Sequence, residues 1–232
     1  MLDGDKKMKD KTMIVDIKHY VDRRKVLFTA DEHYGSERHL FLNKRPFSTV
    51  AEADETMVNR FNQIADDDTL TFHIGDFGDF EMVELLKGQH ILICGNYDDE
   101  VKGTAVKGFV GLATGQYCFN QVDTNTLFGF IGLVNLVHKP IDCVMTANGD
   151  VVCNESRRPA SQPFVCEFDS LRDSITNPVY NIFGHIHGLR KITKYGLNVG
   201  VDANNYSPVT CDIVEFYLNA LINHKYDENV FI

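Results

Sequence analysis

The chain has 232 residues, of which 44% are hydrophobic and 24% are charged, an ordinary composition for a globular protein. It carries 23 basic and 33 acidic residues, and the formal net charge of -10 argues against non-specific binding of nucleic acid or anionic membranes. No run of 18 apolar residues is present, which excludes a membrane-spanning helix. We expect residues 1–232 to form a single domain.

The start of the chain and the cysteine spacing both predict a cytoplasmic protein. Residues 1–11 are charged and lack the apolar segment of a signal peptide, and we expect them to be disordered. The cysteines form no C-x-x-C pair and no close Cys/His spacing, which predicts free thiols in a reducing compartment. They are Cys94, Cys118, Cys143, Cys153, Cys166 and Cys211.

Hydrophobic patterning predicts strands and helices that alternate through the first half of the chain, which is typical of a largely parallel α/β core. Thr49 and Glu52 have the spacing of a capping box, and the helix behind them has an apolar face at Met57, Phe61, Ile64 and Ala65. The segment 141–177 is polar and reads as an insertion or cap. In chain order we expect strands at 12–21 and 26–30, the helix after Thr49, a strand at 69–75, a short helix at 80–86, and strands at 90–94, 127–134, 179–183, 191–199 and 211–217.

Side chains that bind metal ions follow five apolar strands. Each short motif alone is expected by chance, but their order, each at the end of a strand, is a strong signal. The carboxyl ends of strands form the ligand-binding edge of an α/β sheet, so we expect these side chains to converge. In chain order they are Asp31, His33, Asp76, Asn96, His138, His185 and His187.

This ligand set predicts a centre with two divalent metal ions. Two Asp, one Asn and four His supply hard oxygens and borderline nitrogens, which suit Mn above all, with Fe, Zn, Co or Ni as alternatives. Seven ligands are too many for one tetrahedral ion but fit two ions that share a carboxylate. Two ions about 3.5–4 Å apart are a known device for cleaving phosphate esters.

The order D-x-H, G-D, G-N-x-D, H, G-H-x-H resembles the calcineurin-like metallophosphoesterase superfamily. The segment 31–47 (DEHYGSERHLFLNKRPF), the later HIGDF, the HKP at 138–140 and the NVGVDANNYSPV at 198–209 resemble small phosphoesterases of bacteria and their phages. The resemblance covers residues 26–138 and 179–217. It implies a four-layer α/β/β/α sandwich with the metal site at the carboxyl ends of the core strands.

The resemblance also implies a role for each ligand. Asp31, His33 and His187 would hold the first metal, Asn96, His138 and His185 the second, and Asp76 would bridge them. A hydroxide bridging the metals would attack phosphorus in line, while the metals stabilise the developing charge. The implied activity is that of a metal-dependent hydrolase, a phosphodiesterase or phosphomonoesterase acting on a small phosphorylated substrate.

The sequence departs from the family pattern at Tyr97, where the usual G-N-H-D motif has the histidine that helps the leaving group depart. A phenol with an ordinary pKa of about 10 is a poor general acid at neutral pH, and Asp98 remains without the histidine it normally orients. We therefore favour diesters as substrates. Ser36 replaces a histidine found in close relatives, and His39 could substitute for it.

Arg38 and Arg45 could clamp a phosphate bidentately, with a surface ion pair as the equally weighted alternative. His73, inside a strand, is expected to belong to the core or to support the metal ligands. Two other functions stay open. A nuclease could use the same centre, although the acidic charge counts against it. A metal-binding scaffold without activity is the other alternative, because of Tyr97.

Overall fold

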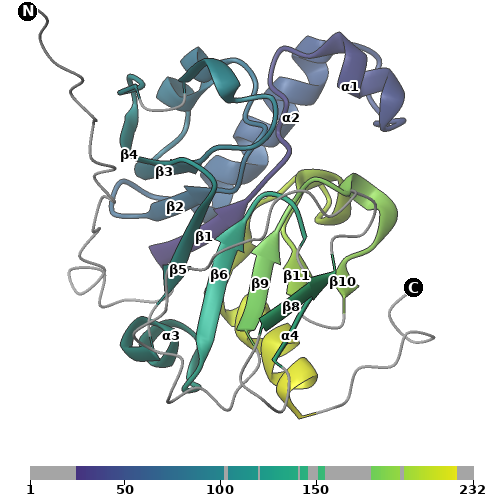
Figure 1. Ribbon diagram of the computed structural model, residues 1–232. Coiled ribbons are helices and arrows are strands. Elements are labelled where there is room, and N and C mark those ends of the chain that lie inside the picture. Colours follow the sequence, from purple (N-terminus) through teal and green to yellow (C-terminus); the bar gives the residue numbers. More distant parts are fainter. Residues whose placement is uncertain are drawn as a thin grey trace, which may run out of the picture.

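The computed structural model describes residues 25–101, 104–119, 121–140, 142–145, 151–154, 179–193 and 196–223. These residues form a mixed α/β fold built on two five-stranded sheets (Figure 1). The expected strand at 12–21, the expected disorder of 1–11 and most of the 141–177 segment lie outside the described residues. No described helix is long and apolar enough to cross a membrane.

The first sheet has the strand order β12-β1-β2-β3-β4. Its strands β1 to β4 pair in parallel, and β12 adds an antiparallel edge beside β1. β1 and β2 are buried along their whole length, which explains the apolar run Val26–Phe28 of β1, while in β2 the polar Thr71 and His73 are buried as well. The strands are β1 (Val26–Thr29), β2 (Leu70–His73), β3 (Gln89–Ile93), β4 (Phe109–Ala113) and β12 (Val209–Thr210).

The second sheet has the order β10-β11-β9-β6-β5, with parallel pairs at its centre and antiparallel pairs at both edges. Two further strands, β7 (Asp142–Met145) and β8 (Val151–Asn154), form an antiparallel hairpin within the expected insertion. The strands of the second sheet are β5 (Gln116–Phe119), β6 (Leu133–Val137), β9 (Val179–Phe183), β10 (Ile192–Thr193) and β11 (Gly196–Asn198).

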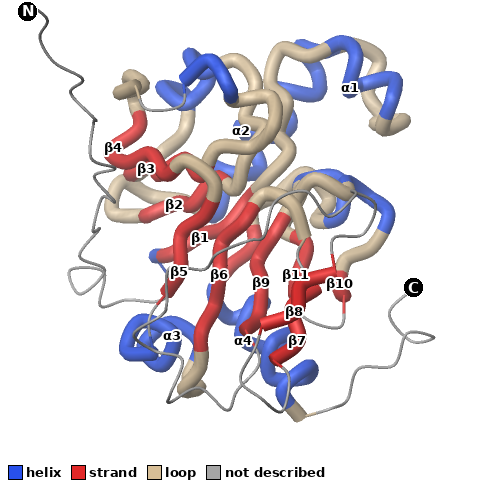
Figure 2. The backbone as a smooth tube through the Cα atoms, in the orientation of Figure 1, coloured by secondary structure: helices blue, strands red, loops and turns tan. Residues whose placement is uncertain are grey.

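Among the described residues, four α-helices and several 3-10 turns connect and cover the strands (Figure 2). The α-helices are α1 (Glu37–Leu42), α2 (Val50–Ile64), α3 (Gln121–Phe128) and α4 (Cys211–Ile222). The 3-10 turns are η3 (Phe80–Leu85), η4 (Asp99–Val101), η5 (His187–Leu189) and η6 (Val201–Ala203).

The main hydrophobic core lies between the inner faces of the two sheets. Phe28 of β1 stacks on Phe72 of β2 at 5.7 Å between ring centroids, and side chains of β6, β9, α3 and α4 belong to the same cluster. A second cluster packs α2 against the opposite face of the first sheet, through Met57 and Phe61 on Leu27. Both faces of the first sheet are therefore buried, so its polar loops gather at the ends of its strands.

The predicted capping box and several predicted elements are confirmed. Thr49 caps α2 by accepting a hydrogen bond from the Glu52 amide at 3.1 Å. Met57 and Phe61 are buried as expected, but Ile64 is 45% exposed, so its place on the apolar face was wrong. The strands expected at 26–30, 69–75, 90–94 and 179–183 correspond to β1, β2, β3 and β9, and the segment 191–199 contains β10 and β11.

Two predicted strands were wrong. The run expected as a strand at 127–134 contains the end of α3 and the start of β6, separated by a turn that includes Gly129. The segment 211–217 is the first part of α4, whose buried residues recur at helical spacing at Cys211, Val214, Leu218 and Leu221. The short helix expected at 80–86 is the 3-10 turn η3, and β4 and β5 were not predicted.

Candidate metal centre

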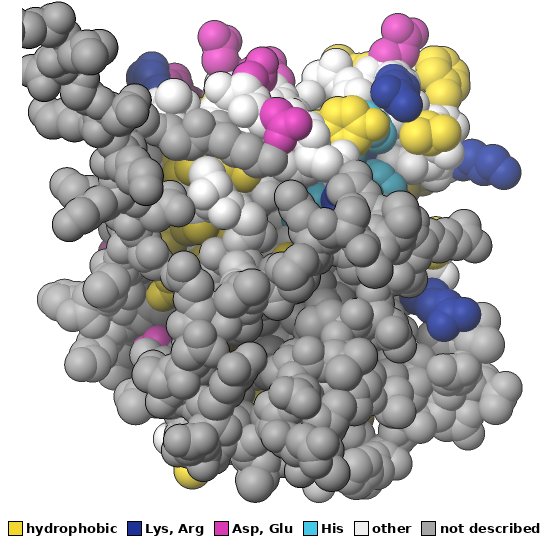
Figure 3. Space-filling model, viewed as in Figure 1, with side chains coloured by type: hydrophobic (Ala, Val, Ile, Leu, Met, Phe, Trp, Pro, Cys, Tyr) yellow, Lys and Arg dark blue, Asp and Glu magenta, His cyan; other side chains and the backbone are white. Residues whose placement is uncertain are grey.

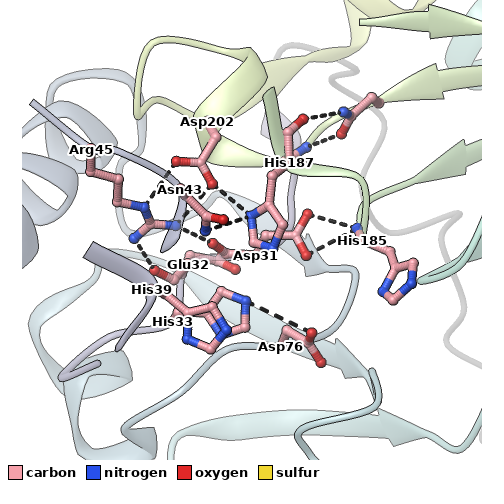
Figure 4. A network of polar contacts seen from close by, with 12 residues as sticks. Asp31, Glu32, His33, His39, Asn43, Arg45, Asp76, His185, His187 and Asp202 are labelled. Atoms are coloured by element: carbon pink, nitrogen blue, oxygen red, sulfur yellow. Dashed lines mark hydrogen bonds and ion pairs between the residues drawn. The ribbon is translucent and has the colours of Figure 1, made fainter. Parts of the chain in front are cut away.

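The seven expected ligands lie in the segments that follow the carboxyl ends of β1, β2, β3, β6 and β9. Figure 4 shows five of them side by side, although they come from segments far apart in the sequence: Asp31, His33, Asp76, His185 and His187. Because neighbouring parallel strands end at the same edge, the topology itself gathers these side chains. The predicted convergence is therefore present in the fold for six of the seven: Asp31, His33, Asp76, His138, His185 and His187.

The ligand atoms form two groups, each with its ligand atoms within 4.8 Å of one another. The first ligand group is Asp31, His33 and His187, and the second ligand group is Asp76, His138 and His185. Asp76 Oδ2 lies 3.1 Å from His138 Nε2 in its own group and 3.8 Å from His33 Nε2 in the other. This carboxylate therefore lies between the two groups, where a bridging ligand has to be.

The backbone at these ligands is unusual. Only eight described non-glycine residues have a positive φ, and five of them are expected ligands. Left-handed backbone is disfavoured for residues with a Cβ, and it concentrates at functional sites where the surrounding structure enforces it. The five are Asp31 (φ 58°), His33 (50°), Asp76 (59°), His185 (70°) and His187 (49°).

Two glycines allow the ligand loops to approach closely. A Cβ on Gly95 would lie 2.2 Å from Asp76 Oδ1, and a Cβ on Gly184 would lie 2.7 Å from Asp31 Oδ2. No side chain fits at either distance. These glycines are therefore needed because a carboxylate occupies the space that a side chain would take.

Two imidazoles of the centre, His33 and His185, are held in the neutral form that binds metals. Burial is the largest cause that lowers the pKa of His33 to about 2 and that of His185 to about 4. Burial also raises the pKa of Asp31 to about 6, although the nearby His138 and His187 act to lower it. For His138, the carboxylates of Asp76 and Asp31 outweigh burial and raise the pKa. His33 and His185 thus present neutral nitrogen lone pairs. They lie next to carboxylates whose ionised form a nearby cation would stabilise.

Three buried atoms at the centre have no well-aligned hydrogen-bond partner among the described residues, although Asp76 Oδ2 lies 3.1 Å from the last of them: His33 Nε2, Asn96 Oδ1 and His138 Nε2. Buried polar atoms are nearly always paired, and an ion is one accepted explanation for those that are not. His138 donates from Nδ1 to the Ile74 carbonyl at 2.8 Å, which leaves its Nε2 lone pair for a metal. The donor set and these three atoms are compatible with bound metal ions.

Asp98 does not orient Tyr97 in this structure. Its buried carboxylate accepts hydrogen bonds from the backbone amides of Asp76 and Gly95, both at 2.7 Å, and of Phe77 at 3.2 Å. It therefore ties the loop after β2 to the loop after β3. In this way it supports the positions of Asp76 and Asn96.

Of the residues expected near the substrate, His39 and Tyr97 lie beside His33 and Arg38 lies beside Tyr97, and we call this part of the site its mouth. His39 stacks on His33 at 3.5 Å between ring centroids, and its Nδ1 lies 2.8 Å from Ser36 Oγ. Tyr97 is 49% exposed and turns its ring edge to His33 and His39, and the exposed Arg38 lies 6.0 Å from its ring centroid. Figure 3 shows histidine side chains at the surface here, next to hydrophobic and basic ones.

Arg45, expected as a phosphate clamp, is buried and directed elsewhere. Its guanidinium donates to the Asp31 carbonyl at 2.7 Å and to the Glu32 carbonyl at 2.8 Å. It also pairs with both oxygens of Asp202, at 2.9 Å from Nε and 3.1 Å from Nη2. This arrangement uses the donors that a bidentate phosphate clamp would need.

Sequence reasoning missed Asp202 and Glu32. Asp202 Oδ2 lies 2.7 Å from His187 Nδ1, and its position in the NVGVD segment, an acid within an apolar run, was the available signal. Glu32 contacts His73 Nδ1 at 2.7 Å, and His73 Nε2 contacts His90 Nδ1 at 3.0 Å. This buried chain confirms His73 as a core residue that also supports the loop carrying Asp31 and His33.

Comparison with known proteins gives the fold but no activity. No family model matches the chain. Over 83 residues it is 29% identical to an uncharacterized protein of Methanocaldococcus jannaschii, a match that covers 32% of this chain and about half of that relative, 47%. The crystal structure of AQ665, a protein of unknown function from Aquifex aeolicus, is similar with a TM-score of 0.53 and 18% identity. That likeness covers 85% of this chain and 98% of the other, so the two share a fold.

Proposed function

We propose that this protein is a metal-dependent phosphoesterase that hydrolyses phosphodiesters at a centre of two divalent cations. The observation that carries the proposal is the pair of ligand groups with Asp76 between them, together with the three buried atoms that lack well-aligned partners. The four-layer metallophosphoesterase sandwich and a small phosphorylated substrate are parts of the same proposal.

In this proposal each residue of the centre has a distinct role. The first ligand group would hold one ion, the second ligand group with Asn96 would hold the other, and Asp76 would bridge them. Two bound cations would supply an activated water and stabilise charge on the phosphoryl oxygens. His39, Tyr97 and Arg38 line the mouth, where Arg38 is the exposed cation that can contact a phosphate.

The preference for diesters rests on two features. A monoester carries a second negative charge, which an additional cation would have to neutralise. Arg45 is not free to do so, because its guanidinium already binds the carbonyls of Asp31 and Glu32 and the carboxylate of Asp202. The exposed Tyr97 stands in place of a general acid, so esters with acidic leaving groups should react best.

The test is metal-dependent hydrolysis of bis(p-nitrophenyl) phosphate. Protein stripped with a chelator should be inactive, Mn²⁺ should restore turnover, and Asp76→Asn should abolish it. Asp67→Asn is the matched control, because Asp67 is an exposed loop carboxylate after α2. If the protein binds two Mn²⁺ ions but hydrolyses no aryl diester, nucleotide or nucleic acid, a metal-binding scaffold without activity is favoured. If it hydrolyses nucleic acid alone, a nuclease is favoured.

A further inference from the structure

The environment of His187 differs from that of the other ligands because a carboxylate lies behind it. Asp202 Oδ2 contacts His187 Nδ1 at 2.7 Å, and the side-chain amide of Asn43 lies 3.0 Å from the same nitrogen. An ionised carboxylate only accepts hydrogen bonds, so Nδ1 carries the proton and Nε2 is left to bind an ion. Such a partner fixes the tautomer and the ring orientation of a metal-binding histidine.

The same carboxylate is fixed by Arg45, whose guanidinium lies at the left of the network in Figure 4. Arg45 holds both oxygens of Asp202 and also donates to the carbonyls of Asp31 and Glu32. Asp31 is a ligand itself, and the Glu32 carbonyl belongs to the peptide unit that leads into His33. One buried side chain therefore contacts the backbone of the DEH loop and, through Asp202, the side chain of His187.

Each ligand of the first group thus depends on this network, whereas no hydrogen bond joins Arg45 or Asp202 to a residue of the second ligand group within the described chain. The two halves of the first group come from opposite ends of the sequence, 31–33 and 187. Arg45 and Asp202 join them across 157 positions. A planar guanidinium with five donors can make these contacts together, and an ammonium cannot.

We propose that Arg45 and Asp202 are positioning residues that assemble the first ligand group and so set the affinity of one of the two ions. This inference rests on the proposed metal centre. It gives the acidic residue of the NVGVD segment a role in metal binding, and it assigns Arg45 to the protein scaffold and not to the substrate. In this proposal neither Arg45 nor Asp202 would contact the substrate or the ions directly.

The experiment compares Mn²⁺ binding to full-length wild type, Asp202→Asn and Arg45→Lys. Each is stripped and titrated with Mn²⁺, with binding followed by calorimetry and by electron paramagnetic resonance. Wild type should bind two ions and show the spectrum of an exchange-coupled pair. In both variants one ion should bind about 10- to 100-fold more weakly, leaving the spectrum of an isolated Mn²⁺ ion, while the other ion binds as in wild type.

Matched variants separate positioning from general damage to the fold. Arg60→Lys is the control for Arg45→Lys, because Arg60 contacts Asn205 at the surface near the site but no ligand. Asp202→Asn keeps the size of the side chain, and circular dichroism of the stripped proteins checks that each is folded. His187→Ala gives the reference spectrum for loss of the first ion.

The outcomes distinguish the two proposals. If wild type binds no pair of ions, the proposed metal centre fails. If wild type binds two ions and both variants bind two with unchanged affinity, the metal centre stands and the positioning role is overturned. Equal weakening of both ions in the folded variants would also overturn it, because the network contacts only the first ligand group.

Discussion

Tyr97 gives the most specific residue-level prediction. Its ring lies at the mouth of the centre, next to His33 and His39, and the proposed phosphoesterase function would expect a histidine at this position. Tyr97→His should restore a proton donor and raise the hydrolysis of diphenyl phosphate about tenfold or more, with little change for bis(p-nitrophenyl) phosphate, whose leaving group needs no proton. The measurement is kcat/KM for both diesters. Tyr97→Phe is the control, and an equal effect of Tyr97→His on both substrates would contradict the expected role.

Gly95 allows a second prediction about a single residue. An alanine there would place its Cβ 2.2 Å from Asp76 Oδ1 and force the central carboxylate to move. Gly95→Ala should therefore weaken Mn²⁺ binding about tenfold or more, as measured by titration of the stripped protein. Gly188→Ala is the matched control close to the site, because its added Cβ would meet nothing nearer than 3.7 Å. Similar affinities in the two variants would show that Asp76 tolerates the displacement.

At the scale of elements, β2 and β3 contribute a pair of buried histidines that make stability depend on pH. Burial is the largest cause that lowers the pKa of both His73 and His90 to about 3, from 6.5 in an unfolded chain. As pH falls from 6.5 toward 3, the unfolded chain takes up protons that the folded chain excludes. Each histidine then removes about 1.4 kcal/mol of unfolding free energy per pH unit.

His90→Gln isolates this effect, because glutamine can still hydrogen-bond His73 but cannot be protonated. Denaturant unfolding of the stripped proteins between pH 6.5 and 4 should show a shallower loss of stability in the variant. Glu32 acts in the opposite direction, since burial raises its pKa to about 8 and its contribution is lost as pH rises from 4.5 to 8. Glu32 is present in both proteins, so its effect cancels in the comparison. Parallel pH profiles would contradict the prediction.

The elements also show which parts of the fold sequence patterns can predict. β1 and β3 could be predicted because strands buried on both faces contain continuous apolar runs, here Val26–Phe28 and Ile91–Ile93. The segment that begins at Cys211 was misread, because in a short window the apolar residues of a buried helix look like those of a strand. Buried positions at 211, 214, 218 and 221 reveal the helix only when the full 12 residues are considered.

For the whole molecule, the proposed centre couples metal binding to folding. The ligands come from five strand ends in two sheets, so bound ions stabilise only the assembled protein. Mn²⁺ at about 100 times its dissociation constant should add about 2.7 kcal/mol per ion. Chelation should lower the melting temperature, readdition of Mn²⁺ should restore it, and Asp76→Asn should abolish the response. Identical melting of stripped and loaded wild type would argue against a folded-state metal centre.

The convergence of the ligands could be predicted from the sequence because strand ends follow from local patterns and the carboxyl ends of parallel strands meet at one edge of a sheet. The supporting residues could not. Arg45 and Asp202 are 157 positions apart, and their contact depends on how the two sheets pack. The sequence therefore left Arg45 as either a phosphate clamp or a surface ion pair, and only the tertiary structure shows its guanidinium buried against a carboxylate and two carbonyls.

The left-handed backbone at five expected ligands limits how this centre could be moved to another protein. A designer who places the same side chains on regular strands or helices would aim their Cβ vectors differently, because φ sets the direction in which each side chain leaves the chain. The transferable unit is therefore the loops with their conformations, and β-branched residues would be poor replacements at these positions. Asp, Asn and His tolerate positive φ better than most residues, so the backbone itself narrows the choice of ligands.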